Sequence, residues 1–290
     1  MPVNDDLETR MKEYYEQIPK TKLMRRTPVI IRIDGKAFHT FTKGFKRPFD
    51  EVLIKSMQET AKYLCENIQG CVLAYTQSDE ITLVLVDYKK LNSSAWFDYE
   101  VQKMCSIAAS MATMAFNKFF LDNVDIAFNE EFHKRGLNEG GTFSEFDKLE
   151  EEFDVYYKKT GKAMFDARVF NIPKEEVTNC LYWRQLDATR NSIQMIGQAN
   201  FSHKELQHKT CNMIQDMLME QKDINWNDFP THQKRGSCVI KEEYLPYEPA
   251  PGYEDCEINA LDYRTRWIID TEIPIFKGEG REYIEKLINF

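Results

Sequence analysis

The stretch Val29-Ile30-Ile31-Arg32-Ile33-Asp34-Gly35-Lys36-Ala37-Phe38-His39 decides the fold of this chain. Its β-branched apolar run is typical of a buried strand, and the strand ends at Asp34-Gly35, where glycine permits a sharp turn. On this stretch alone, a plain Asp-Gly turn is the simpler interpretation. A second stretch, Ala74-Tyr75-Thr76-Gln77-Ser78-Asp79-Glu80, also places acids at a strand end. Together they predict an acidic rim at one edge of a sheet.

The composition is that of a soluble globular protein. The 290 residues, 42% hydrophobic and 29% charged, suffice for one large domain or a core with an appended lobe. We expect no membrane span and no secretory signal. The seven cysteines form no CxxC pair, which favours reduced thiols and a cytoplasmic location. The net charge of −9 argues mildly against a nucleic-acid partner, but the acids are unevenly spread and leave small basic clusters at Lys43 to Arg47 and at Lys234-Arg235.

The predicted core has the order strand, helix, strand, strand, helix, strand. Its elements are a strand at 28–33, a helix from about 50 to 70, a hairpin of 71–76 and 81–86, a helix at about 95–120 and a strand at 164–172. This order is the split βαβ, or ferredoxin-like, arrangement of an α+β fold. In this arrangement the first and third strands are neighbours. Asp34 and Asp79 should therefore meet at one rim, with Glu80 beside them.

The rest of the chain surrounds this core. We assign residues 1–173 to the core domain, with a surface insertion at about 125–162, and residues 174–290 to a C-terminal helical lobe with a terminal strand. The expected elements outside the core are a leading helix over 5–22, helices at 175–199 and 203–221, a loop at 225–237, a strand at 266–269 and a helix at 281–288.

The rim acids suit phosphate chemistry. Carboxylate oxygens are ligands that Mg²⁺ prefers, and a pair of such ions could clamp the attacking and leaving oxygens of a phosphoryl or nucleotidyl transfer. Gly35 would let the following amides approach a triphosphate closely. Lys36, Arg47 and Lys103 are candidates for neutralising phosphate charge. The alternative is that the acids only solvate a hairpin tip. His39 could stack on a base or play a structural role.

Four ordered motifs carry a family resemblance. They are Arg32-Ile33-Asp34-Gly35-Lys36-Ala37-Phe38-His39, Tyr75-Thr76-Gln77-Ser78-Asp79-Glu80, Phe165-Asp166-Ala167-Arg168 and Trp183-Arg184-Gln185-Leu186-Asp187. Over roughly 25–240 the chain resembles the tRNA-histidine guanylyltransferase family. The resemblance implies a polymerase-type palm domain, two Mg²⁺ ions, a homo-tetramer, and 3′-to-5′ addition of nucleotides to a tRNA 5′ end that ATP activates or that already carries a triphosphate.

The resemblance also implies roles for individual residues. Asp34, Asp79 and Glu80 match catalytic acids, and Asp34, Gly35 and Asp79 match the metal ligands. The positions that match nucleotide contacts for ATP, GTP or other nucleoside triphosphates are Lys36, Ala37, Phe38, His39, Arg47, Asp50, Ser78 and Lys103. For an acidic subunit that must gather an anionic tRNA, we expect a basic patch at Lys234 and Arg235 to contact the RNA.

Departures from the family pattern refine the expected activity. After the Trp-Arg-Gln motif, eukaryotic members carry Cys-His-Ile-Asn-Asn, whereas this chain has Ala188-Thr189-Arg190-Asn191-Ser192. The missing histidine favours the bacterial and archaeal guanylyltransferase-like branch, which repairs truncated tRNA 5′ ends against a template. Three alternatives stay open: a tRNA-histidine guanylyltransferase that adds one guanosine, a palm-fold nucleotidyl cyclase, and a non-catalytic RNA-binding protein.

Overall fold

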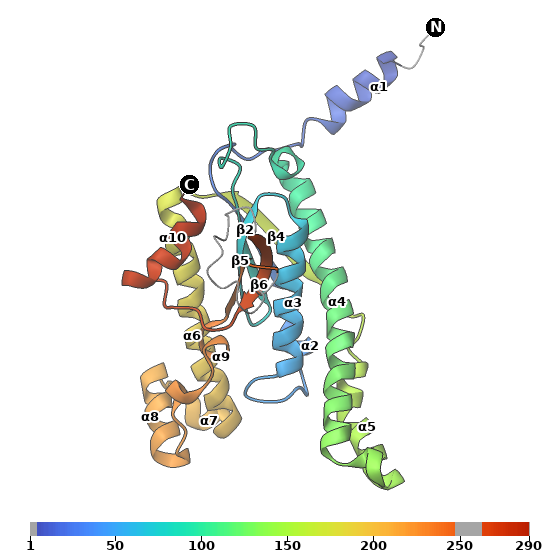
Figure 1. Cartoon of the computed structure of the whole chain (residues 1–290), viewed down its shortest axis with the longest axis vertical. Helices are drawn as coiled ribbons and strands as arrows, with labels where there is room; N and C mark the ends of the chain where they lie inside the picture. The colour runs from blue at the N-terminus through green and yellow to red at the C-terminus, as the bar shows by residue number, and fades with distance from the viewer. Residues whose placement is uncertain (1–4, 247–262, 290) are drawn as a thin grey trace, which may run out of the picture.

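The computed structural model describes residues 5–246 and 263–289, and its centre is one antiparallel sheet (Figure 1). The strands are β1 (Val29–Gly35), β2 (Cys71–Gln77), β3 (Glu80–Leu85), β4 (Phe165–Asn171), β5 (Ser237–Tyr244) and β6 (Arg264–Asp270), in the order β4-β1-β3-β2-β5-β6. The first and third strands are neighbours, as the sequence predicts. This pairing brings the end of β1 and the start of β3 to the same edge of the sheet, as the predicted acidic rim requires.

Helices cover both faces of this sheet. They are α1 (Asp5–Met11), α2 (Phe38–Phe41), α3 (Glu51–Asn67), α4 (Val101–Lys134), α5 (Phe143–Tyr157), α6 (Val177–Asn200), α7 (His203–Leu206), α8 (Cys211–Lys222), α9 (Thr231–Arg235) and α10 (Glu282–Ile288). In Figure 1, α3 and α4 lie on one side of the sheet, and α6 and α10 lie on the other.

The alternation of β1 explains this layering. Val29, Ile31 and Ile33 belong to the main core cluster with α3 and α4, whereas Ile30 packs with α6 and α10. Successive side chains of a strand point to opposite faces. The polar residues of β1 that follow Ile30 in this alternation, Arg32 and Asp34, therefore lie on the α6 face.

The second long helix extends beyond its predicted end. The sequence predicts it over about 95–120, but α4 begins at Val101 and continues to Lys134. Apolar residues beyond 120 keep it packed: Val124 is fully buried, and the Phe128 ring lies edge-on to Phe153 of α5. The predicted insertion at 125–162 thus contains the end of α4 and all of α5, which joins the main core cluster.

By length and composition, α4 is also the helix of the described part of the chain that could cross a membrane. Core helices of soluble proteins share these properties, and α4 packs on the sheet side through Met104, Ala108 and Ala112. The expectation that the chain has no membrane span stays a prediction.

Three further predictions need correction. The leading helix is shorter than 5–22, since α1 ends at Met11 and a π-helical turn covers Lys12–Glu16. Part of the predicted loop at 225–237 is helical, as α9. The sequence does not predict strand β5, because its apolar run is only Cys238-Val239-Ile240 and charged residues follow directly. It joins the C-terminal part to the core sheet through β2, and the division at residue 173 stays a prediction.

Candidate active site

The predicted acidic rim is present where β1 and β3 meet. In the antiparallel register of these strands, Asp34 lies opposite Glu80. The backbone N–H of Gly35 donates to the carbonyl of Asp79 at 3.0 Å, which closes the rim directly beside the turn. Ser78 in this turn has a left-handed backbone, with φ of 51°. The expected meeting of the two strand ends is confirmed.

The charges at this rim are crowded. Burial raises the pKa of Asp79, and the nearby Asp34 carboxylate adds to the rise. No cluster of three or more His, Cys, Asp or Glu side chains that could hold a metal ion occurs in the described ranges. Two carboxylates and a backbone carbonyl are nevertheless hard oxygen donors, and Mg²⁺ typically takes one or two carboxylates and completes its shell with water and substrate phosphates. The donor set of Asp34, Asp79 and Gly35 fits such an ion.

A cavity of about 560 Å³ adjoins this rim. It brings together most of the residues predicted to contact a nucleotide, although they come from β1, the following loop, α3 and the 77–80 turn. Its predicted lining residues are Gly35, Ala37, Phe38, His39, Arg47, Asp50, Ser78 and Asp79. Lys43 and Lys46 add two bases to the lining, and Met195 and Gln198 of α6 close one side. Three bases, Lys43, Lys46 and Arg47, thus line a cavity that ends at the acid Asp79.

The loop after β1 is fixed by the packing of Phe38 against Gly35 and the core. A Cβ on residue 35 would lie 2.3 Å from the ring of Phe38, so glycine is required there. Phe38 is buried, with its ring centroid 5.5 Å from that of Phe116 and 5.1 Å from that of Phe165. Phe38 therefore anchors the loop in the core. Ala37 has a left-handed backbone, and the side chains of Lys36, Ala37 and His39 are exposed around the buried Phe38.

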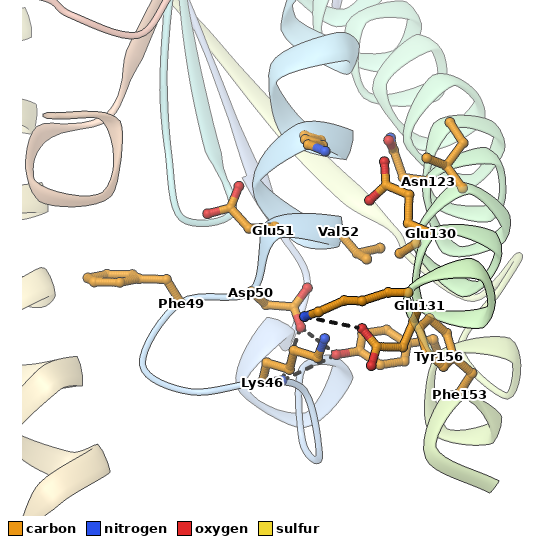
Figure 2. A pocket seen from close by; sticks show the side chains of 14 residues that line it. Lys46, Phe49, Asp50, Glu51, Val52, Asn123, Glu130, Glu131, Phe153 and Tyr156 are labelled. Atoms are coloured by element: carbon orange, nitrogen blue, oxygen red, sulfur yellow. Dashed lines mark hydrogen bonds and ion pairs between the residues drawn. The ribbon is translucent and has the colours of Figure 1, made fainter. Parts of the chain in front are cut away.

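Asp50 anchors the other wall of the cavity. Its carboxylate caps α3 by accepting from the Leu53 N–H at 2.9 Å, and it also accepts from the Lys46 N–H at 3.0 Å and the Tyr156 hydroxyl at 2.6 Å. Figure 2 shows Lys46, Asp50 and Tyr156 converging beneath the start of α3. Asp50, which is predicted to contact a nucleotide, thus lines the cavity, but its carboxylate oxygens already accept hydrogen bonds from the protein. Sequence reasoning missed Tyr156, which α5 supplies.

Glu80 has a buried partner on α6. The Arg184 Nε donates to its carboxylate at 2.7 Å, and both side chains are about nine-tenths buried. Arg184 also contacts Asp187 at 3.0 Å. In the same motif, Gln185 binds the carbonyl of Pro274 and the N–H of Phe276. The Trp-Arg-Gln motif therefore fastens α6 to the rim and to the C-terminal segment, and it gives Glu80 a positioning partner.

Lys103 does not reach the cavity. The hydroxyl of Thr113 on α4 accepts from the Phe165 N–H, and Phe165 lies opposite Gly35, so Thr113 marks the level of the rim. Lys103 is ten residues earlier on this helix, about 15 Å away along its axis at about 1.5 Å per residue. Its ammonium lies over the ring of Phe97. Its predicted role as a phosphate contact has no support in this placement.

The predicted basic patch is also largely unavailable. Lys234 is buried, its ammonium donates to the carbonyl of Asn227 at 2.5 Å, and burial lowers its pKa. Arg235 is partly buried, and its Nε has no hydrogen-bond partner among the described residues. Lys234 therefore stabilises the 226–235 segment, and the expectation that it contacts RNA is not supported.

Acids at a strand end, a glycine turn held by a buried ring and a cation-lined cavity are together typical of an enzyme that transfers nucleotides. The family model described as tRNAHis guanylyltransferase, Thg1, matches residues 8–173. The chain belongs to this family, and it is a tRNA guanylyltransferase-type nucleotidyltransferase. The resemblance inferred from the four motifs is confirmed.

Solved structures and curated relatives agree with this assignment. A bacterial tRNA(His) guanylyltransferase-like protein in complex with ATP is 39% identical, with a TM-score of 0.74, over 97% of this chain and 98% of that chain. A structure described as the bacterial guanylyltransferase-like protein in complex with GTP is 37% identical, with a TM-score of 0.69, over 99% of this chain and 100% of that one. The tRNA(His) guanylyltransferase of Saccharomyces cerevisiae is 26% identical over 74% of this chain and 82% of its own length.

Proposed function

We propose that this protein is a template-dependent 3′–5′ nucleotidyltransferase that restores nucleotides at the 5′ end of tRNA. The observation that carries the proposal is the cavity at the rim, where Gly35, Ser78 and Asp79 lie beside Lys46 and other cations. The strand order β4-β1-β3-β2 supports a ferredoxin-like, polymerase-type palm around this rim.

The cavity suits a nucleoside triphosphate in size and charge. Ligand pockets typically measure about 300–1,000 Å³, and the 560 Å³ here falls within that range. Lys43, Lys46 and Arg47 supply positive charge for the phosphates. The related bacterial structures are complexes with ATP and GTP, which supports the same two nucleotides as substrates here.

Asp34 and Asp79, with the carbonyl of Gly35, would hold two Mg²⁺ ions. Such ions, when bound, lower the pKa of an attacking hydroxyl and neutralise charge on the leaving group. In the reaction the 3′-hydroxyl of the incoming nucleotide attacks the phosphorus at the activated RNA 5′ end. A new P–O bond forms, and the bond to the AMP or pyrophosphate leaving group breaks. The residues that line the cavity bind and orient the incoming triphosphate during this step.

Template dependence is supported by what stands after the Trp-Arg-Gln motif. Thr189 and Arg190 occupy the region where eukaryotic members carry a histidine, and Arg190 is paired with Asp187 at 2.6 Å. Base pairing with the opposite strand would then choose the nucleotide. Addition of one guanosine to tRNA-histidine is the second candidate, favoured by the similarity to the yeast enzyme. We also propose that the protein is cytoplasmic, forms a homo-tetramer and has no membrane partner.

The test is incubation of a 5′-truncated tRNA with Mg²⁺, ATP and all four nucleoside triphosphates, followed by measurement of RNA chain length. We expect elongation by the wild type and loss of elongation in Asp34→Asn and Asp79→Asn. Glu51→Gln, which removes one exposed carboxylate at the start of α3, is the matched control and should keep activity. A product made from GTP without RNA would instead indicate a cyclase, and RNA binding without elongation would indicate a non-catalytic protein.

A further inference from the structure

Two arginines lie directly opposite each other beside Asp34. Arg32 of β1 pairs with Arg168 of the edge strand β4, and Asp34 follows two residues later on the same face. Like charges directly opposite each other in an antiparallel pair are destabilising. An anion bound between these guanidinium groups would relieve that repulsion, so the pair has the character of a binding site.

Neither arginine is firmly committed to a protein carboxylate. Arg32 is half-buried, and in the part of the chain that the structure describes it has no carboxylate within 4.0 Å. Arg168 approaches Asp166 at 3.5 Å, but both side chains are more than half exposed. Exposed pairs of this kind contribute little and exchange readily. Both guanidinium groups are therefore available for phosphate oxygens, which arginine can bind through two parallel hydrogen bonds.

An exposed indole lies beside Arg32, which is the register partner of Arg168. Trp183 of α6 is 53% exposed, an unusual value for a tryptophan on a helix that packs on a sheet. Its ring centroid lies 5.7 Å from the Arg32 guanidinium carbon and 4.5 Å from that of Arg184. Arg184 is fixed by Glu80, so one of the two guanidinium groups over the indole is held in place. Aromatic faces beside arginines bind nucleobases by stacking, with little preference for sequence.

We propose that Arg32, Arg168 and Trp183 form a subsite for the 5′-terminal nucleotide of the RNA, with its base stacked on the indole and its phosphate between the two arginines. This inference rests on the proposed function. The incoming nucleotide has its own place in the rim cavity, whose lining includes neither arginine nor Trp183. Asp34 lies between the two sites along β1, where the RNA 5′ end must meet the incoming nucleotide.

Intrinsic fluorescence tests the stacking directly. The chain has four tryptophans, and a short RNA hairpin with a 5′-monophosphate should quench the fraction that Trp183 contributes. We expect Trp183→Phe to lose this quenching and Trp183→Ala to weaken hairpin binding about 5-fold to 150-fold, the range of alanine substitution at a stacking aromatic. Trp267→Phe, on the opposite edge strand, is the matched control and should quench as the wild type does.

The arginine pair has its own matched control. Arg168→Ala should raise the KM for RNA, leave the KM for GTP unchanged and lower the salt dependence of hairpin binding by about one unit. Arg266→Ala should change none of these, because Arg266 is a similarly exposed, carboxylate-paired arginine on edge strand β6.

Three results would overturn the subsite. They are unchanged quenching in Trp183→Phe, equal KM values for RNA in the two arginine variants, and a Trp183 signal produced by free GTP but not by the hairpin. If the wild type does not elongate RNA, the proposed function fails. The binding and quenching measurements still decide the subsite in that case.

Discussion

Replacing Arg184 with methionine should sharply destabilise the protein. The change removes the partner of a carboxylate that is 7% exposed and leaves Glu80 charged in the interior, 2.7 Å from where the guanidinium was. Breaking a buried ion pair by removing one partner typically costs about 3–5 kcal/mol. We therefore expect the free energy of unfolding of Arg184→Met to fall by about that amount.

A double-mutant cycle separates this charge effect from lost packing. Glu80→Gln keeps a hydrogen-bond acceptor, and Arg184 retains Asp187, so this change should cost only about 1–2 kcal/mol. The double variant should be similar to Glu80→Gln alone, because no uncompensated charge remains. The coupling energy between the two positions should therefore match the cost of Arg184→Met, about 3–5 kcal/mol.

Urea unfolding of the four proteins at about pH 7 and about pH 5 provides the measurement. Burial already raises the pKa of Glu80, and Arg184 opposes that rise. Without Arg184 the carboxylate takes up a proton at a higher pH, so the deficit of Arg184→Met should shrink as the pH falls. Additive single changes, or a deficit independent of pH, would refute the claim that Arg184 compensates a buried Glu80 charge.

Three further predictions concern the rim and its loops. Asp79→Asn should make the metal-free protein more stable near pH 7, because the pKa of Asp79 is raised in the folded state and its charged form therefore destabilises that state. This destabilisation disappears in acid, so the difference in urea midpoint between the two proteins should shrink as the pH falls, and a difference independent of pH would contradict the prediction. Tyr156→Phe removes a hydrogen bond to Asp50, so it should lower the free energy of unfolding by about 1–3 kcal/mol and raise the KM for GTP. An unchanged KM would show that this hydrogen bond does not support nucleotide binding in the cavity. Gly35→Ala should cost about 1–3 kcal/mol by overpacking against Phe38. Adding Phe38→Leu should recover part of that loss in thermal unfolding, and a double variant less stable than Gly35→Ala alone would contradict the clash.

The sequence predicted the centre of the fold well, because it depends on local patterns. The apolar run that ends at Asp34 and the hairpin around Asp79 each specify strands, and the intervening helix orders them so that both acids share a rim. Most of the cavity lining could also be predicted, because many of its residues lie close together in sequence between Gly35 and Asp50.

Long-range packing explains what the sequence did not reveal. Tyr156 and Asp50 are 106 positions apart in sequence, and no local sequence pattern predicts their hydrogen bond. Lys234 is basic in sequence, but its stem and ammonium are buried over Trp226. Lys103 belongs to a helix whose direction places its first turn away from the rim. The Tyr156 contact comes from a segment distant in the chain, whereas Lys234 and Lys103 are held by neighbours within ten residues, Asn227 and Phe97, whose placement depends on the tertiary fold.

The central claim, template-dependent repair of a tRNA 5′ end, is tested most directly by truncated tRNAs that differ only in the base facing the missing nucleotide. Four such tRNAs are incubated with the protein, Mg²⁺, ATP and all four nucleoside triphosphates, and the added nucleotide is identified. Each tRNA should receive the Watson–Crick partner of its facing base. Addition of guanosine whatever that base is, and only to tRNA-histidine, would contradict it.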